Sequence, residues 1–199
     1  AQMNKDFSST TADTANTQTP FKGLEADVEV RFALATIDEI GNCTNGITRH
    51  YDANTNWDKG VTPFDYTWDR TKYYNIYVVK SFSSGIAGYS SFPGTNGPSS
   101  DVTVCLSNYI GNMGTSTPGN AHTMTHETGH FLNLYHIWDC CTANNTACGT
   151  DAVGDTPQTK GYSPGNCPTG TGNQICNAGI SENLNNFMDY SYCYTMFTA

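Results

Sequence analysis

The 199-residue sequence has no C-x-x-C pair, no G-x-S-x-G motif and no internal repeat. It also has no apolar run approaching the ~18–20 residues that span a bilayer, so it predicts no transmembrane helix. The missing C-x-x-C argues against zinc ribbons, and the missing G-x-S-x-G argues against a serine nucleophile. The first residues form no charged-then-apolar leader, and we therefore expect a mature chain from which signal and pro-segment have been removed.

Charged residues are also scarce, at 14% of the chain, and the 18 acidic residues outnumber the 9 basic ones. A net charge of −9 opposes binding to a nucleic-acid backbone or to an anionic membrane, and we expect neither partner. The acidic balance suits a protein that holds calcium or stays soluble outside cells, and it equally suits a merely acidic surface. The length fits one main domain, with the oligomeric state open and a monomer favoured.

Cysteine, in contrast, is abundant and even in number, with eight residues. In a chain without C-x-x-C this favours disulfides and an oxidising, extracellular compartment. Six of the eight lie at or after residue 140, where glycine, asparagine and proline replace any regular periodicity. Such an irregular region needs cross-links to stabilise it.

Four segments predict strands. Residues 26–35 alternate apolar and polar side chains, as in a half-buried strand, and residues 74–79 are rich in the residues that favour a central strand. Residues 86–92 and 101–106 predict two more. The polar residues 1–25 predict a loosely ordered N-terminal arm, which leaves residues 26–199 as the folded domain.

The clearest chemical signal lies in residues 126–136, which hold three of the five histidines. His126 and His130 are four residues apart, so on a helix their rings lie on one face and can reach the same zinc ion. Glu127 stands beside them, as a general base does in the H-E-x-x-H motif. A third ligand from His136 would leave the fourth zinc position open, which is typical of a catalytic site. We expect this helix to begin near His122 or Thr123, with a threonine cap.

Asn133 lies between the helix and the third histidine. For His136 to reach the metal, the chain must leave the helix and turn sharply, which a residue with positive φ does most easily. Asparagine adopts this conformation more readily than any other residue except glycine. An ordinary mid-helix asparagine would instead carry His136 away from the metal. The other two histidines, His50 and His122, are expected to be bystanders, which means surface or capping residues rather than metal ligands.

The pattern H-E-x-x-H-x-x-(G/N)-x-x-H resembles that of the metzincin metallopeptidases, and its context resembles the pappalysin, or cytophagalysin, family. Asn133 is the departure, since the family usually has glycine there. The resemblance covers about residues 26–198, and its motifs occur in family order. The further matching stretches are residues 32–35, 44–49, 74–79, 88–93, 154–157 and 186–190.

The resemblance implies an α+β fold with a metzincin-like (zincin) catalytic domain over residues 26–199. An upper part, about residues 26–136, would hold a twisted mixed sheet and the active-site helix. A lower part, about residues 137–199, would be irregular and stabilised by disulfides and calcium. A cleft between them would take an extended peptide or protein substrate, paired with residues 86–92 as an edge strand.

The same resemblance assigns roles near the C-terminus. Met188 would be the Met-turn residue that forms an apolar floor beneath the zinc ligands, a role close to that of a plain core methionine. Tyr190 would stand near the metal and donate a hydrogen bond to the developing oxyanion, although a tyrosine chosen at random from the twelve would be structural. Glu127 would take a proton from a zinc-bound water and pass it to the leaving amine.

One glycine-containing loop carries two carboxylates and a hydroxyl, which belong to Asp151, Asp155 and Thr156. Hard oxygen ligands of this kind suit Ca²⁺, and a solvated acidic turn would look similar. The resemblance favours a structural calcium ion.

For the cysteines, the resemblance implies two disulfides, Cys148–Cys176 and Cys167–Cys193. The spacing alone does not decide the rest. The adjacent Cys140 and Cys141 are expected to bond to different partners, and Cys43 and Cys105 also remain unassigned.

Together these features predict a secreted, zinc-dependent endopeptidase with one catalytic Zn²⁺ and structural Ca²⁺. A catalytically weak zinc- and calcium-binding extracellular interaction module is the main alternative. Glu127 argues against it, because a purely structural zinc site has no use for a carboxylate there. A calcium-stabilised adhesion domain and a zinc hydrolase acting on a non-peptide substrate also remain possible. Cleavage preference, natural substrate and the number of calcium ions are not predicted.

Overall fold

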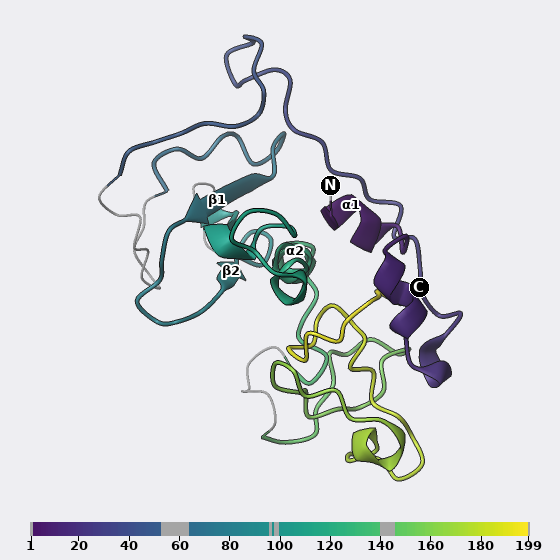
Figure 1. Ribbon diagram of the computed structural model, residues 1–199. Coiled ribbons are helices and arrows are strands. Elements are labelled where there is room, and N and C mark those ends of the chain that lie inside the picture. Colours follow the sequence, from purple (N-terminus) through teal and green to yellow (C-terminus); the bar gives the residue numbers. More distant parts are fainter. Residues whose placement is uncertain (1, 53–63, 96, 98–99, 140–145, 199) are drawn as a thin grey trace.

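The computed structural model describes residues 2–52, 64–95, 97, 100–139 and 146–198 (Figure 1). A small sheet and the helix α2 form one part of the molecule, and an irregular region that follows α2 forms the other. The purple N-terminal segment runs beside the yellow C-terminal segment, and a bridge between Glu25 and Thr198 joins them. No helix among the described residues is long and apolar enough to cross a membrane.

Within the described residues, the sheet has three strands in the order β1-β3-β2, namely β1 (Asn75–Val79), β2 (Gly88–Ser90) and β3 (Val102–Leu106). β1 is parallel and β2 antiparallel to β3, so the sheet is mixed as expected. The prediction of a central strand at residues 74–79 is wrong in position. Among the strands of the described residues, β1 lies at an edge with Val78 57% exposed, whereas Val104 of β3 is fully buried. β-propensity predicts a strand but does not say which neighbours it has.

The predicted strand at residues 26–35 is wrong. Val30 and Phe32 do pack against the core, in keeping with the alternation, but the segment forms no ladder. Its backbone groups bond elsewhere. The Phe32 amide donates to the Asn4 side chain at 2.8 Å, and the Asn4 amide donates back to the Phe32 carbonyl at 2.9 Å. A side chain from the N-terminal segment thus replaces the neighbouring strand.

The N-terminal segment is not the loosely ordered arm that its polar composition predicts. It contains the helix α1 (Gln2–Phe7) and two 3-10 turns, Ala12–Asn16 and Thr19–Phe21. Phe7 is 1% exposed and joins the same apolar cluster as Phe187 and Phe197. Buried aromatic side chains at intervals along a polar segment are sufficient to dock it.

Helix α2 (Thr123–Phe131) lies between α1 and the sheet (Figure 1). All its residues from Thr123 to His130 are buried, which is unusual for a helix with this many polar side chains. The expected threonine cap is wrong, because His122 occupies the N-cap position and makes no side-chain cap bond, and Thr123 is the first helical residue.

After α2, the described residues form no further α-helix or ladder strand, only a 3-10 turn at Gly170–Asn173 and isolated bridges. Disulfides join Cys148 to Cys176 and Cys167 to Cys193, the two pairs that the family resemblance implies, with Cα atoms 5.6 and 6.1 Å apart. Cys43 is exposed and Cys105 buried, and neither forms a disulfide. Residues 140 and 141 lie outside the described part of the chain. The region shares one apolar cluster with Phe7 of the N-terminal segment, and it contributes Ile137, Trp138, Phe187, Met188, Tyr194 and Phe197.

Candidate metal centre

Helix α2 brings the first two predicted zinc ligands together. His126 and His130 are one turn apart on the same face, with ring centroids 4.8 Å apart. The helix then ends at Phe131, and Asn133 adopts φ +74°, the left-handed conformation that the sequence predicts. The Leu134 amide donates back to the Gly129 carbonyl at 2.9 Å, which closes the turn in the manner of a helix C-cap.

This turn carries His136 back to the helix. The ligand atoms of His126, His130 and His136 all lie within 4.8 Å of one another, and the Nε2 atoms of His130 and His136 are 3.1 Å apart. Among the described residues, no other group of three histidine, cysteine or acidic side chains converges in this way.

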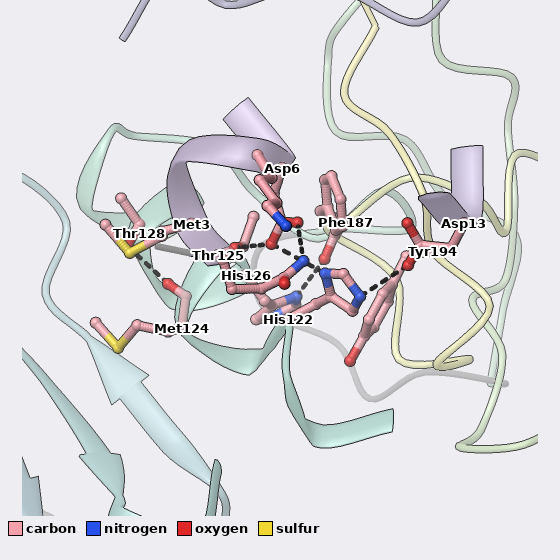
Figure 2. Close-up of polar contacts among 12 residues, drawn as sticks. Met3, Asp6, Asp13, His122, Met124, Thr125, His126, Thr128, Phe187 and Tyr194 are labelled. Atoms are coloured by element: carbon pink, nitrogen blue, oxygen red, sulfur yellow. Dashed lines mark hydrogen bonds and ion pairs between the residues drawn. The ribbon is translucent and has the colours of Figure 1, made fainter. Parts of the chain in front are cut away.

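The hydrogen bonds of the first two rings fix which nitrogen is free. His126 Nδ1 donates to the Phe187 carbonyl at 2.7 Å (Figure 2), and His130 Nδ1 donates to the Leu134 carbonyl at 2.8 Å. Each Nε2 therefore keeps its lone pair and faces the centre of the triad. Burial lowers the pKa of all three histidines, including His130. The pKa of His126 falls well below its ordinary value, and the pKa of His136 falls to about 3. Neutral imidazoles with converging lone pairs fit a zinc ion.

Glu127 is buried at the side of the triad, and burial raises the pKa of its carboxyl group to about 8. Gly88 of β2 leaves the space that this carboxylate occupies. A methyl group at Gly88 would come within 3.1 Å of Glu127 Cγ, 3.2 Å of its Oε1 and 2.9 Å of the Val104 carbonyl. The sequence predicts no specific role for Gly88. Its position inside a predicted strand is the available signal, because a glycine there often marks a close approach.

Met188 and Tyr190 belong to the irregular region, and both lie close to the triad or to the helix that carries it. Met188 is 2% exposed and lies against Gly129, where a methyl group would overlap its sulfur atom. The Tyr190 ring lies 5.3 Å from His126 and 4.8 Å from His136, centroid to centroid. Burial and the charges of Glu127 and Asp189 raise the pKa of Tyr190 to about 12, so its phenol stays protonated and can donate.

A second charged cluster lies at the start of α2 (Figure 2). His122 bonds through Nδ1 to Asp6 at 2.9 Å and through Nε2 to Asp13 at 3.0 Å, and Thr125 donates to the same Asp6 oxygen. Burial lowers the pKa of His122, but the hydrogen bonds and charges of Asp13 and Asp6 raise it to about 9. His122 is not part of the triad, but it is buried rather than at the surface, and its two ion pairs link the N-terminal segment to α2. His50 stacks on Tyr66 instead.

The predicted calcium loop forms a compact turn. Asp151 is 9% exposed, and its Oδ1 accepts a hydrogen bond from the Val153 amide at 3.0 Å. Burial raises the pKa of Asp151, and the exposed Asp155 adds to the increase while a hydrogen bond from Thr156 opposes it. No salt bridge formed by the described residues involves either aspartate.

A mixed sheet, a buried helix bearing two histidines and a glutamate, and a sharp turn to a third histidine define a domain of the metzincin class. The match to a family of sequences is more specific. The Peptidase_M43 family, described as pregnancy-associated plasma protein-A, matches residues 56–199, and the chain belongs to this family.

Solved structures and sequence relatives agree with this assignment. Mirolysin in complex with compound 9 superposes with a TM-score of 0.85 at 31% identity, over 99% of this chain and 77% of that one. Mature mirolysin of Tannerella forsythia in complex with a cleaved peptide gives 0.81 at 30% identity, with the same coverage. An extracellular metalloprotease of Arthroderma otae is 35% identical over 130 residues, 62% of this chain and 46% of that protein. One of Podospora anserina is 34% identical over 160 residues, 73% and 52% respectively. The chain thus spans about half the length of these two extracellular metalloproteases.

Proposed function

We propose that this chain carries the active site of a secreted, zinc-dependent endopeptidase. The observation that carries the proposal is the convergence of three neutral imidazoles, two of them buried and one half-buried, with a buried carboxylate at their side. His126, His130 and His136 would hold the ion. When bound, zinc supplies a Lewis acid that polarises the scissile carbonyl and makes water acidic enough to attack at neutral pH.

The chain's own residues would move the protons and stabilise the charge. The Glu127 carboxylate takes a proton from the attacking water and delivers it to the nitrogen of the leaving amine. The protonated phenol of Tyr190 donates a hydrogen bond to the carbonyl oxygen of the substrate as negative charge develops there. Met188 supports the rings from beneath, and its contact with Gly129 ties the floor of the site to α2.

An extended peptide is the substrate that the fold accommodates best. β2 pairs with β3 on one side only, so within the described residues its other edge has no strand partner. A peptide backbone can add to such an edge as a further strand. In support, the structurally similar mirolysin binds a cleaved peptide.

Secretion and calcium complete the proposal. The relatives are named extracellular metalloproteases, and two disulfides stabilise the irregular region.

The turn formed by Asp151, Asp155 and Thr156 would bind Ca²⁺. Two nearby carboxylates, one of them buried, repel each other unless a cation lies between them. Asp151→Asn should then abolish any increase in melting temperature caused by Ca²⁺.

The test is hydrolysis of denatured casein by the wild type, Glu127→Gln and Glu127→Ala, with bound zinc quantified in each. All three should bind about one zinc ion, and both variants should lose roughly three orders of magnitude in rate. A zinc-loaded wild type that is as inert as the variants would instead favour the extracellular interaction module. A calcium-dependent function that persists without zinc would favour an adhesion domain.

A further inference from the structure

The three zinc-ligand rings are oriented by different means. His126 and His130 each donate an Nδ1 hydrogen bond to a backbone carbonyl, at 2.7 and 2.8 Å. His136 Nδ1 has no hydrogen-bond partner within the described part of the chain. Histidines that bind metals almost always donate their second nitrogen to a carbonyl, carboxylate or water, because that bond fixes the ring. The third ligand therefore needs another source of orientation.

Trp138 provides a flat surface for this ring. Its indole stacks on the His136 imidazole with centroids 4.5 Å apart and planes inclined by only 3°. The other rings around His136 meet it differently. His130 and Tyr190 approach edge-on, at 86° and 71°, and His126 is tilted by 26° at 5.2 Å. Among the described aromatic and histidine rings, only that of Trp138 lies nearly parallel to His136 with centroids within 5 Å.

The indole is itself held in place. Trp138 is 1% exposed and belongs to the apolar cluster that the irregular region shares with Phe7. Two glycines leave the room it needs: a methyl group at Gly161 would overlap the indole ring, and one at Gly149 would overlap the Trp138 carbonyl. Gly161 also has φ +70°, a conformation that other residues rarely adopt. Gly149 is fixed by a two-way backbone pairing with Thr159, at 2.8 and 3.1 Å.

We propose that Trp138 is a positioning residue for the metal, whose indole face holds the His136 ring so that Nε2 points into the triad. The inference rests on the proposed zinc site. The rotation of a histidine ring about χ2 is only weakly restricted by its own geometry, so a ring without a hydrogen bond must be confined by its neighbours. Without the indole, His136 would lose this confinement, and zinc binding would have to order it.

The test measures the zinc dissociation constant of the full-length chain by chelator competition, in the wild type, Trp138→Leu and Trp138→Phe. Loss of an orienting partner weakens metal binding about 10–100-fold, which is the expectation for Trp138→Leu. Trp138→Phe keeps a smaller aromatic face and should weaken binding about 2–10-fold. A core truncation also destabilises the fold, and the matched control is therefore Phe7→Leu. Phe7 is equally buried in the same cluster and lies against Phe32 and Phe197 rather than the ligands.

The proposal predicts that Phe7→Leu lowers the melting temperature but binds zinc like the wild type. Equal zinc affinity in Trp138→Leu and the wild type, or an equal loss in Phe7→Leu, would overturn it. If Trp138→Leu does not fold, Trp138→Phe decides, and a wild-type dissociation constant in that variant then overturns the proposal.

As a second readout, Co²⁺ should quench the tryptophan emission of the wild type, and this quenching should be lost in Trp138→Phe. A wild type that binds no zinc at all would refute the proposed function itself, whereas the other outcomes leave it intact.

Discussion

The metal centre has two halves of different construction. The helix half consists of His126, Glu127 and His130 on α2, where the spacing of the residues along a regular helix sets their positions. The loop half consists of the described residues that follow α2, 132–139 and 146–198, which contain no ladder strand and no α-helix. The helix half is buried throughout, and the loop half combines exposed side chains, such as Leu132 at 42%, with Met188 and Trp138, which are 2% and 1% exposed. Irregular backbone can therefore be as closely packed as a helix.

The two halves differ in which groups form hydrogen bonds with their backbone N–H and C=O groups. In the loop half, buried side chains do what a helix or ladder does elsewhere. Glu182 is fully buried and accepts hydrogen bonds from the Cys176 amide at 2.8 Å, the Thr159 hydroxyl at 2.6 Å and the Tyr162 hydroxyl at 3.0 Å. A few such side-chain acceptors and two disulfides replace the regular hydrogen bonds. The loop half should thus depend on individual residues more than the helix half does.

Removing a disulfide should produce the largest effect on stability. Cys167→Ala with Cys193→Ala releases the chain beside Tyr190, and losing a native disulfide costs roughly 2–5 kcal/mol. We expect the melting temperature, followed by circular dichroism, to fall by about 5–20 °C. Cys43→Ala removes an exposed, unbonded cysteine and serves as the control, with a change of about 1 °C. A double variant as stable as this control would show that the loop half does not need the cross-link.

The helix half should instead respond to pH. The pKa of His122 in the folded chain is about 9, above the ~6.5 of an unfolded histidine, because Asp6 and Asp13 face it. The stabilisation is complete below about pH 6.5 and is lost as the pH rises through about 9, with a size of roughly 3 kcal/mol. Urea denaturation at pH 6.5 and 9.5 measures it. His122→Gln should remove most of this pH dependence; an unchanged dependence would assign it to other groups.

Gly88→Ala tests how closely the helix half is fitted to the sheet. The added methyl group would press on Glu127 and on the Val104 carbonyl. Displacement of a catalytic group by about 1 Å costs up to ~100-fold in rate, so we expect kcat to fall about 10–100-fold. Zinc content should not change, since no zinc ligand is touched. Gly119→Ala is the control, because its methyl group would meet only ordinary contacts, the nearest at 3.7 Å. Wild-type kcat in Gly88→Ala would show that Glu127 has room to move.

Gly129→Ala probes the contact between the two halves. Within a helix this change normally stabilises by about 1 kcal/mol. Here the methyl group would overlap the Met188 sulfur, and overpacking costs about 1–3 kcal/mol. We expect a net loss of about 1 kcal/mol in the free energy of unfolding. In a Met188→Ala background the same substitution should become neutral or stabilising, and additive effects in the double variant would contradict the contact.

The smallest effect is expected at the junction of the halves. Asn133 has φ +74°, where glycine is less strained but loses more entropy on folding. Asn133→Gly should change stability by no more than about 0.5 kcal/mol and leave zinc affinity unchanged. Asn133→Val should cost more than 1 kcal/mol and weaken zinc binding, because a β-branched residue strongly resists this conformation. Equal behaviour of the two variants would show that the turn can re-form in another way.

The sequence alone determined the helix half of the site and the conformation of the turn. Histidines four residues apart share one face of any helix, and Asn133 between them and His136 predicts the positive φ that the structure has. The two disulfides were implied by family resemblance, not by spacing. Strands β1, β2 and β3 were predicted by composition, but the position of β1 at the edge was not.

The tertiary structure decided the rest, because it depends on contacts between residues far apart in the chain. Residues 26–35 alternate like a strand, but the side chain of Asn4 takes the place of a neighbouring strand. His122 looks like an isolated histidine until Asp6 and Asp13 are brought to it. Trp138 is an unremarkable aromatic residue in the sequence, and only the fold lays it parallel to His136. Local patterns determine local geometry, whereas the orientation of a ring in an irregular region is set by whatever the rest of the chain packs against it.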